Sequence, residues 1–228
     1  MRWLIALLFA FVTFPAAAQT TPWQPQYFAV GIADDSGIGG VISYRIGADG
    51  KLDGRFALHG SDGRIEREMA TPRKRGALAG TYDTRGVSQG EAYTGVLTIA
   101  PIGRASGGEG ELYRLSWDNG DRGVAIRSGQ MLTVAFGQNG DTVGMLFSTA
   151  PGEWSVVAIG WRDGAERRVG LSWTGELAEG NHWVRPLAGG PREQLRLAPN
   201  GATWRLYFDD GNYGVAMPVA APPLKLGG

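Results

Sequence analysis

The sequence contains no cysteine and only two histidines among its 228 residues. Without thiols there is no disulfide framework, so the fold must be held by core packing and backbone pairing alone. A zinc site is not expected either, because two isolated histidines do not complete a ligand set. What the chain has in excess is glycine: its 37 residues are more than twice the usual share of about 7%, which indicates many tight turns.

An excess of charge of one sign is also missing, since 22 basic residues balance 22 acidic ones. No long-range field would steer the chain to nucleic acid or to an anionic membrane, and we expect no nucleic-acid partner. The one dense basic run, Arg73-Lys74-Arg75, is interpreted as a solvated linker, with a heparin-like or lipopolysaccharide contact as the alternative. No cofactor is expected.

Long apolar runs are absent except at the start of the chain. Arg2, the apolar stretch from Trp3 to Phe14 and the alanines at 16–18 have the order of a secretory signal, so residues 1–18 are predicted to be a cleaved signal peptide. The stretch is too short to span a bilayer, and an uncleaved signal anchor is the alternative. We expect a periplasmic or secreted bacterial protein with no membrane span in the mature chain.

An internal repeat organises the remaining residues. YRLSWDNGDRGVAI (113–126) aligns without gaps with WRLYFDDGNYGVAM (204–217) at a spacing of 91 residues. GVLTIAPIG (95–103) matches QLRLAPNG (194–201), and YFAVGIADDSGIGGVISY (27–44) matches MLTVAFGQNGDTVGMLFS (131–148) in its apolar positions at a spacing of 104. A repeat of this size indicates two related structural units.

The repeat predicts a first β unit at 19–127, a second at 128–218 and a disordered tail at 219–228. An interlocked arrangement is the alternative, in which 80–173 forms one unit and 23–72 plus 179–218 form the other. The first copy carries an insertion from Arg104 to Leu112, which is typical of a hairpin tip.

Apolar and polar residues alternate with period two between turn signals such as Asp118-Asn119-Gly120 and Asp163-Gly164, which is the pattern of short strands joined by tight hairpins. No 3.6-residue period follows the signal. We therefore predict an all-β antiparallel meander with about eight strands in each unit, closed into barrels, with a sandwich as the alternative. An outer-membrane barrel is disfavoured because many of the predicted strands are shorter than the roughly 9–11 residues that a strand needs to cross a bilayer.

The segment GTYDTRGVSQGEAYTGVLTI (80–99), then YRLSW, GVAI and SGQMLTVAFGQNG, resembles a class of uncharacterised bacterial exported β-repeat proteins. Those proteins share a Gly-x-Tyr start, a Tyr-x-Gly-x-Leu-x-Ile strand and a Tyr-x-x-x-Trp strand. The resemblance covers 80–173 and implies no activity. The meander is also similar to avidin-like and lipocalin-like barrels, by analogy of fold alone.

Two patterns suggest chemistry, and both are better explained by turns. Gly86-Val87-Ser88-Gln89-Gly90 matches a nucleophile elbow, but its context is strand, turn, strand, and only His59 or His182 could act as the base. The acidic turns at 34–35, 118–121 and 209–212 offer oxygens to calcium without the spacing of a calcium loop. No catalytic residue and no metal site is predicted.

The tryptophans are the remaining candidates. Trp117, Trp161 and Trp173 lie on the predicted buried faces, and Trp154 and Trp183 lie near strand ends. Core packing is the usual role of such residues, yet an eight-stranded barrel is just wide enough to hold one small ligand. Trp117, Trp161 and Trp173 are therefore predicted to line a ligand site.

Three functions are weighed. The first is a non-catalytic binding module for a small apolar or amphipathic ligand. The second is a structural or protein-interaction module of the cell envelope that presents loops such as 104–112 to an envelope protein. An enzyme of unknown class is the third.

Overall fold

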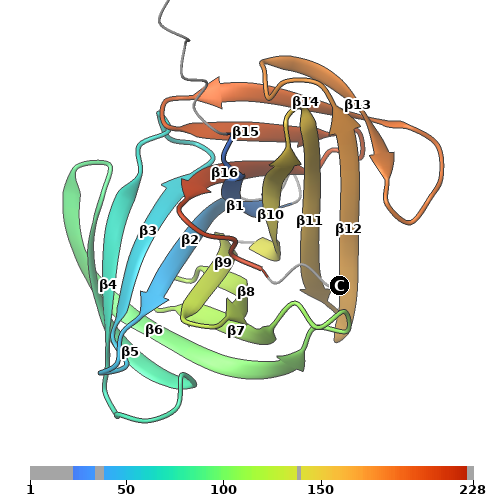
Figure 1. The fold of residues 1–228 in the computed structure, drawn as a ribbon. Helices are drawn as coiled ribbons and strands as arrows, with labels where there is room; N and C mark the ends of the chain where they lie inside the picture. Colours follow the sequence, from blue (N-terminus) through green and yellow to red (C-terminus); the bar gives the residue numbers. More distant parts are fainter. Residues whose placement is uncertain (1–22, 34–38, 138–139, 225–228) are drawn as a thin grey trace, which may run out of the picture.

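A computed structural model describes residues 23–33, 39–137 and 140–224. These residues form sixteen antiparallel strands in two closed eight-stranded barrels (Figure 1), which confirms the predicted all-β fold. Within the described ranges, no helix is long and apolar enough to cross a membrane. The predicted signal peptide at 1–18 lies outside the described residues.

One barrel is continuous in sequence, and each strand pairs with the next. Its strands are β2 (Gly39–Ile46), β3 (Leu52–Leu58), β4 (Glu66–Pro72), β5 (Gly80–Ser88), β6 (Glu91–Arg104), β7 (Glu111–Trp117), β8 (Arg122–Ser128) and β9 (Met131–Gly137). We call it the β2–β9 barrel. Arg73-Lys74-Arg75 lies in its β4–β5 loop, so the basic run is a hairpin loop within one barrel and not a linker between units.

The other barrel is closed by the first strand of the chain. Its strands are β10 (Gly140–Ala150), β11 (Glu153–Arg162), β12 (Ala165–Thr174), β13 (Gly180–Pro186), β14 (Glu193–Asn200), β15 (Thr203–Phe208), β16 (Tyr213–Val219) and β1 (Gln26–Ala33). Figure 1 shows β1, in blue, lying between the late strands β16 and β10. We call it the β10–β1 barrel.

The two repeat units exchange their first strands. At a spacing of 104, β1 corresponds to β9; β9 pairs with β8 and β2, while β1 pairs with β16 and β10. The register agrees as well: Arg122 of β8 lies opposite Gly137 of β9, and Tyr213 and Ala33 occupy the corresponding positions in β16 and β1. Each unit thus supplies seven strands to one barrel and one strand to the other.

The barrel boundaries therefore differ from both divisions expected from the repeat. A cut between 127 and 128 leaves β9 outside the barrel that it closes, and the range 80–173 contains strands of both barrels. The repeat divides the sequence into β1–β8 and β9–β16. The barrels divide differently, because β1 and β9 each form hydrogen bonds with strands of the other repeat unit.

Each barrel has an apolar core, and a further apolar layer lies between the barrels. Tyr113, Leu115 and Trp117 of β7 face the core of the β2–β9 barrel, and Trp204, Leu206 and Phe208 of β15 face that of the β10–β1 barrel, as their alternation predicts. The outer faces of β8–β11 contribute to the layer between them, which includes Val124, Ile126, Val143, Met145, Phe147 and Ile159. Strands in this layer are apolar on both faces.

Two segments fix the barrels to each other. In the insertion 104–112, Glu109 forms a bidentate ion pair with Arg168 of β12, at 2.6 and 2.8 Å. In the tail, Val219 ends β16 and Leu224, 1% exposed, packs into the layer between the barrels. The prediction of a disordered tail is therefore wrong for 219–224, because this leucine has an apolar surface to cover; 225–228 lie outside the described residues.

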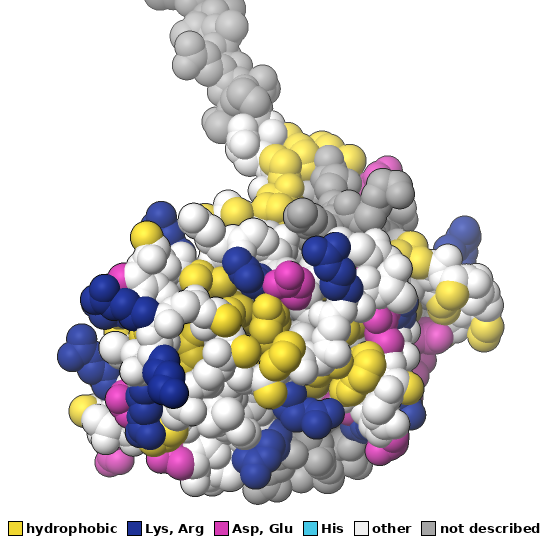
Figure 2. All heavy atoms as spheres, turned by 90° about the horizontal axis from the view of Figure 1, so that it is seen from below, with side chains coloured by type: hydrophobic (Ala, Val, Ile, Leu, Met, Phe, Trp, Pro, Cys, Tyr) yellow, Lys and Arg dark blue, Asp and Glu magenta, His cyan; other side chains and the backbone are white. Residues whose placement is uncertain are grey.

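The surface carries charge of both signs. Figure 2 shows one face on which hydrophobic side chains gather near the centre while Lys, Arg, Asp and Glu side chains are scattered around them. The most exposed large hydrophobic side chains of the described surface are Trp23, Val87, Trp183 and Leu187.

Candidate functional site

The β2–β9 barrel contains a cavity of about 590 Å³ that is open at one end. Its rim is formed by the β5–β6 hairpin, which carries Ser88, Gln89 and Glu91, and by the β7–β8 turn at 118–121. Its apolar wall is formed by side chains from β2, β3, β7 and β9: Ile42, Phe56, Leu58, Trp117 and Phe136. The barrel interior is therefore only partly filled by its own side chains.

A buried carboxyl group lies at the bottom of this cavity. Glu68 on β4 is 3% exposed. The hydroxyl of Tyr44 donates to its Oε1, and the hydroxyl of Tyr93 donates to its Oε2 at 2.7 Å. Trp117 lines the same cavity. Phenols from opposite sides thus hold the carboxyl in one orientation.

This arrangement is built along a single rung of the barrel. Tyr44 lies opposite Gly54, Gly54 opposite Glu68, Glu68 opposite Gly86, and Gly86 opposite Tyr93. A Cβ at Gly54 would lie 2.6 Å from the Tyr44 ring, and a Cβ at Gly86 would lie 2.6 Å from the Tyr93 hydroxyl. The tyrosine rings cross the two glycines to reach the glutamate between them, so any larger residue would block them.

Burial raises the pKa of the three ionisable side chains on this rung. Desolvation raises the pKa of Glu68, and the hydrogen bonds from Tyr44 and Tyr93 offset part of that rise. Desolvation and the neighbouring carboxyl together raise the pKa of both tyrosines, so the phenols remain donors. A carboxyl group with a perturbed pKa in a cavity is the kind of feature that marks functional sites.

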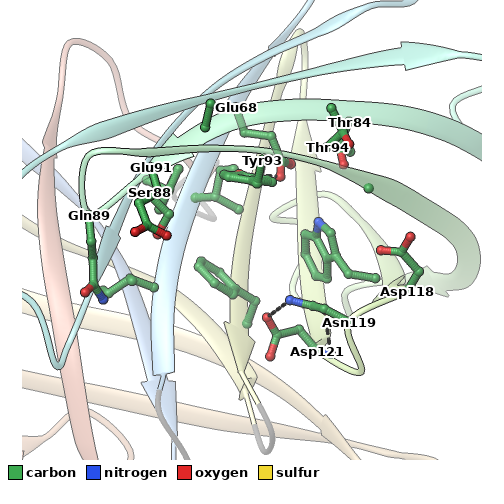
Figure 3. Close-up of a pocket in the computed structure, with 17 residues that line it drawn as sticks. Glu68, Thr84, Ser88, Gln89, Glu91, Tyr93, Thr94, Asp118, Asn119 and Asp121 are labelled. Atoms are coloured by element: carbon green, nitrogen blue, oxygen red, sulfur yellow. Dashed lines mark hydrogen bonds between the residues drawn. The ribbon is translucent and has the colours of Figure 1, made fainter.

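Aromatic rings and further carboxylates lie above the floor. The Trp117 and Phe136 rings are 5.6 Å apart between centroids, and Phe56 lies edge-on to Phe136 at 6.4 Å. Figure 3 shows Glu91 on one side of the space and Asp118 on the other. Asp121 is in the lower part of the view, across the space from Glu68. The Asp121 carboxylate accepts from the Asn119 side chain at 2.9 Å.

One polar atom in the wall has no partner. Thr84 of β5 is 4% exposed, and its Oγ1 makes no hydrogen bond, although it lines the cavity. Buried hydroxyls are normally satisfied, so a ligand or a water molecule is the expected partner for this atom.

The β10–β1 barrel has a second cavity of about 700 Å³, of different character. Its wall includes Trp154 and Trp173, stacked at 6.2 Å, with His182 beside Trp173 at 5.7 Å. Residues of β12 and β13, two strands that share only two residue pairs, line it, and Arg185 and Arg192 are among its lining residues.

The predicted site residues are not brought together. Trp117 lines the cavity of the β2–β9 barrel, and Trp173 lines the other one, with Trp154 and Trp183. Trp161 points out of its barrel and packs in the layer between the barrels. Because that strand is apolar on both faces, alternation could not distinguish the lumen from the layer between barrels.

Sequence reasoning missed Glu68, Tyr44 and Tyr93. One signal was available: Glu68 stands two residues before the buried Ala70 and therefore shares its inward face. A glutamate at an inward position of a strand, with glycines within the neighbouring strands, indicates a buried polar site.

The other chemical candidates lie in turns. Ser88 ends β5 and is followed by Gln89 and Gly90, both with positive φ, so its context is strand, turn, strand. Neither His59 nor His182 lines the cavity that Ser88 borders. Within 23–33, 39–137 and 140–224, no three His, Cys, Asp or Glu side chains gather as a metal site; the turn at 34–35 lies outside these ranges.

No family model, no curated protein and no solved structure matches this chain. The resemblance to exported β-repeat proteins stays a prediction, and the site must be interpreted from its own geometry.

Proposed function

We propose that this protein is an exported binding protein that holds a small organic molecule inside the β2–β9 barrel and performs no chemistry on it. The observation that carries the proposal is the open cavity with a built polar floor. Its volume of about 590 Å³ falls within the range of about 300–1,000 Å³ typical of ligand pockets. An apolar wall with a few convergent polar groups is the usual composition of such pockets.

The polar floor is costly for stability, which argues against a purely structural role. Glu68 is buried among aromatic and apolar side chains, and its ionised form is disfavoured there. A well-packed apolar substitute for a buried charged group is often neutral or stabilising. Binding sites are where proteins retain such groups at the expense of stability.

The alternative of an envelope interaction module has less support. Such a module would need the loop 104–112 to be free to contact a partner. In this fold the loop is bound to the neighbouring barrel, where the backbone N–H of Ser106 donates to Glu166 at 2.9 Å and Glu109 pairs with Arg168.

A lumen-filling variant tests the proposal. Gly95 lines the cavity, and Gly95→Leu would place its side chain against the carboxylate of Asp118 and the hydroxyl of Thr84, the nearest atoms to a Cβ at that position. A small-molecule library is screened against the full mature chain by tryptophan fluorescence, and each hit is measured with both variants. Thr98→Leu, on the exposed face of the same strand, is the matched control.

We expect the hits to bind the wild type and Thr98→Leu alike and to lose at least tenfold in affinity with Gly95→Leu. Hits that bind all three proteins equally, or the absence of any hit, would contradict the proposal.

A further inference from the structure

We propose that the ligand of the β2–β9 barrel is a small organic cation, an amine or quaternary ammonium compound, held between aromatic rings and carboxylates. This inference rests on the proposed function and gives it a ligand class. Binding such a cation requires a surplus of negative charge, aromatic faces, and hydrogen-bond acceptors that have free lone pairs.

The charge around the cavity is of one sign. Four lining residues are acidic, and among the described lining residues none is basic; the four are Glu68, Glu91, Asp118 and Asp121. Two arginines lie outside the rim and are engaged: Arg122 donates to the carbonyls of Gly120 and Asp121, and Arg73 pairs with Asp83 at 2.7 Å. In a confined cavity such a distribution attracts cations and repels anions.

The wall supplies the second requirement. Trp117, Phe136, Phe56 and Tyr93 line one cavity, and the first two rings are tilted to each other by 46° with 5.6 Å between centroids. A cation over the face of an aromatic ring is stabilised by about 0.5–2 kcal/mol, and cages of such rings are how proteins recognise quaternary ammonium groups.

Hydrogen-bond acceptors with free lone pairs are the third requirement. The Oγ1 of Thr84 is buried and has no hydrogen-bond partner, so it can accept from the N–H of an amine or from the O–H of choline. The Glu68 oxygens accept from Tyr44 and Tyr93, and each carboxylate oxygen has a further lone pair. A cation above Glu68 would compensate the desolvation of the ionised carboxylate.

The second cavity provides an internal contrast. Arg185 and Arg192 are among its lining residues, and Glu153 is its one acidic residue among those described. This distribution of charge does not favour a cation in the second cavity. The two barrels therefore differ in the charge that lines their cavities, and the cation is proposed for the β2–β9 barrel alone.

Matched pairs of probes test the charge requirement. Choline is compared with its neutral analogue 3,3-dimethylbutan-1-ol, and 2-phenylethylamine with 2-phenylethanol, by isothermal titration calorimetry on the full mature chain. We expect at least one cation to bind at least tenfold more tightly than its neutral partner. Glu68→Gln should reduce this preference at least tenfold, while Asp53→Asn, an exposed carboxylate on the outside of β3, should leave it unchanged.

The outcomes separate the two claims. If both members of each pair bind equally, or if Glu68→Gln leaves the preference intact, the cation inference is overturned while lumen binding stands. The cation inference is also overturned if no cation binds while a neutral library hit loses its affinity with Gly95→Leu. In that case lumen binding still stands. If neither the pairs nor any library hit responds to Gly95→Leu, the proposed function fails as well.

Discussion

At the scale of the residue, Glu68 is the side chain that links the stability of the protein to its proposed binding site. The carboxyl is buried, accepts from two tyrosines and lies beneath an open space. Desolvation is the largest influence on it and raises its pKa, which means that the folded protein holds this proton more tightly than the unfolded chain. The same side chain therefore lowers stability at neutral pH and is available to a positive ligand.

Glu68→Gln should stabilise the protein, and more so as the pH rises. A carboxyl whose pKa is raised by folding contributes full stability below its unfolded pKa, near 4.5, and loses it as the pH rises through the folded value. Glutamine does not titrate, so the difference between variant and wild type should be small at low pH and largest above the folded pKa. Urea denaturation of both proteins across the pH range measures it, and a difference independent of pH would contradict the account.

Tyr44→Phe should destabilise the protein by about 1–3 kcal/mol, because the buried Glu68 loses a donor. In the Glu68→Gln background the loss should be smaller, since a neutral amide needs that donor less. A double-mutant cycle by urea denaturation measures the coupling. Strictly additive effects would show that the two side chains do not act together.

At the scale of the element, alternation and turn chemistry predict most of the strands. Hairpins such as Asp163-Gly164, where both residues have positive φ, follow from turn preferences alone. The exchange of β1 and β9 could not be predicted, because the two strands share one apolar pattern and either would fit either barrel. Pairing of distant strands is decided by the whole layer between the barrels, where β1, β2, β9 and β10 meet.

The absence of cysteine makes the exchange easy to test. Tyr27 of β1 lies opposite Val219 of β16, so the pair Tyr27→Cys and Val219→Cys should form a disulfide within one chain on mild oxidation. In an arrangement without exchange, Tyr27 would lie opposite Ser128, the position that corresponds to Val219 in the repeat. The pair Tyr27→Cys and Ser128→Cys is therefore the control and should stay reduced.

Non-reducing electrophoresis and mass spectrometry of the monomer read out both pairs. Oxidation of the control pair, with the first pair left reduced, would show that β1 closes the barrel of its own unit.

At the scale of the whole molecule, the site is less predictable than the fold. Trp117 and Trp173 line cavities in different barrels, and Trp161 packs in the layer between the barrels. The sequence did not predict Glu68 as a site residue, because a glutamate in a strand ordinarily faces solvent. Such residues are recognisable only once the inward face of each strand and its neighbours across the sheet are known.

The loop 104–112 should help to hold the two barrels together through its ion pair with Arg168. Glu109→Gln removes the carboxylate that Arg168 contacts at 2.6 and 2.8 Å, and this contact holds the pKa of Glu109 below its ordinary value. We expect faster hydrogen exchange in the loop and in β12, with the β2–β9 cavity still binding its ligand. Unchanged exchange in both segments would show that the loop is held by other contacts.

The most direct test of the central claim is a crystal structure of the mature protein with 2-phenylethylamine or choline, whichever binds more tightly. The account predicts ligand density inside the β2–β9 barrel, with the cationic group between Glu68 and the rings of Trp117 and Phe136. A lumen closed by its own side chains, or a ligand bound only outside that barrel, would contradict it.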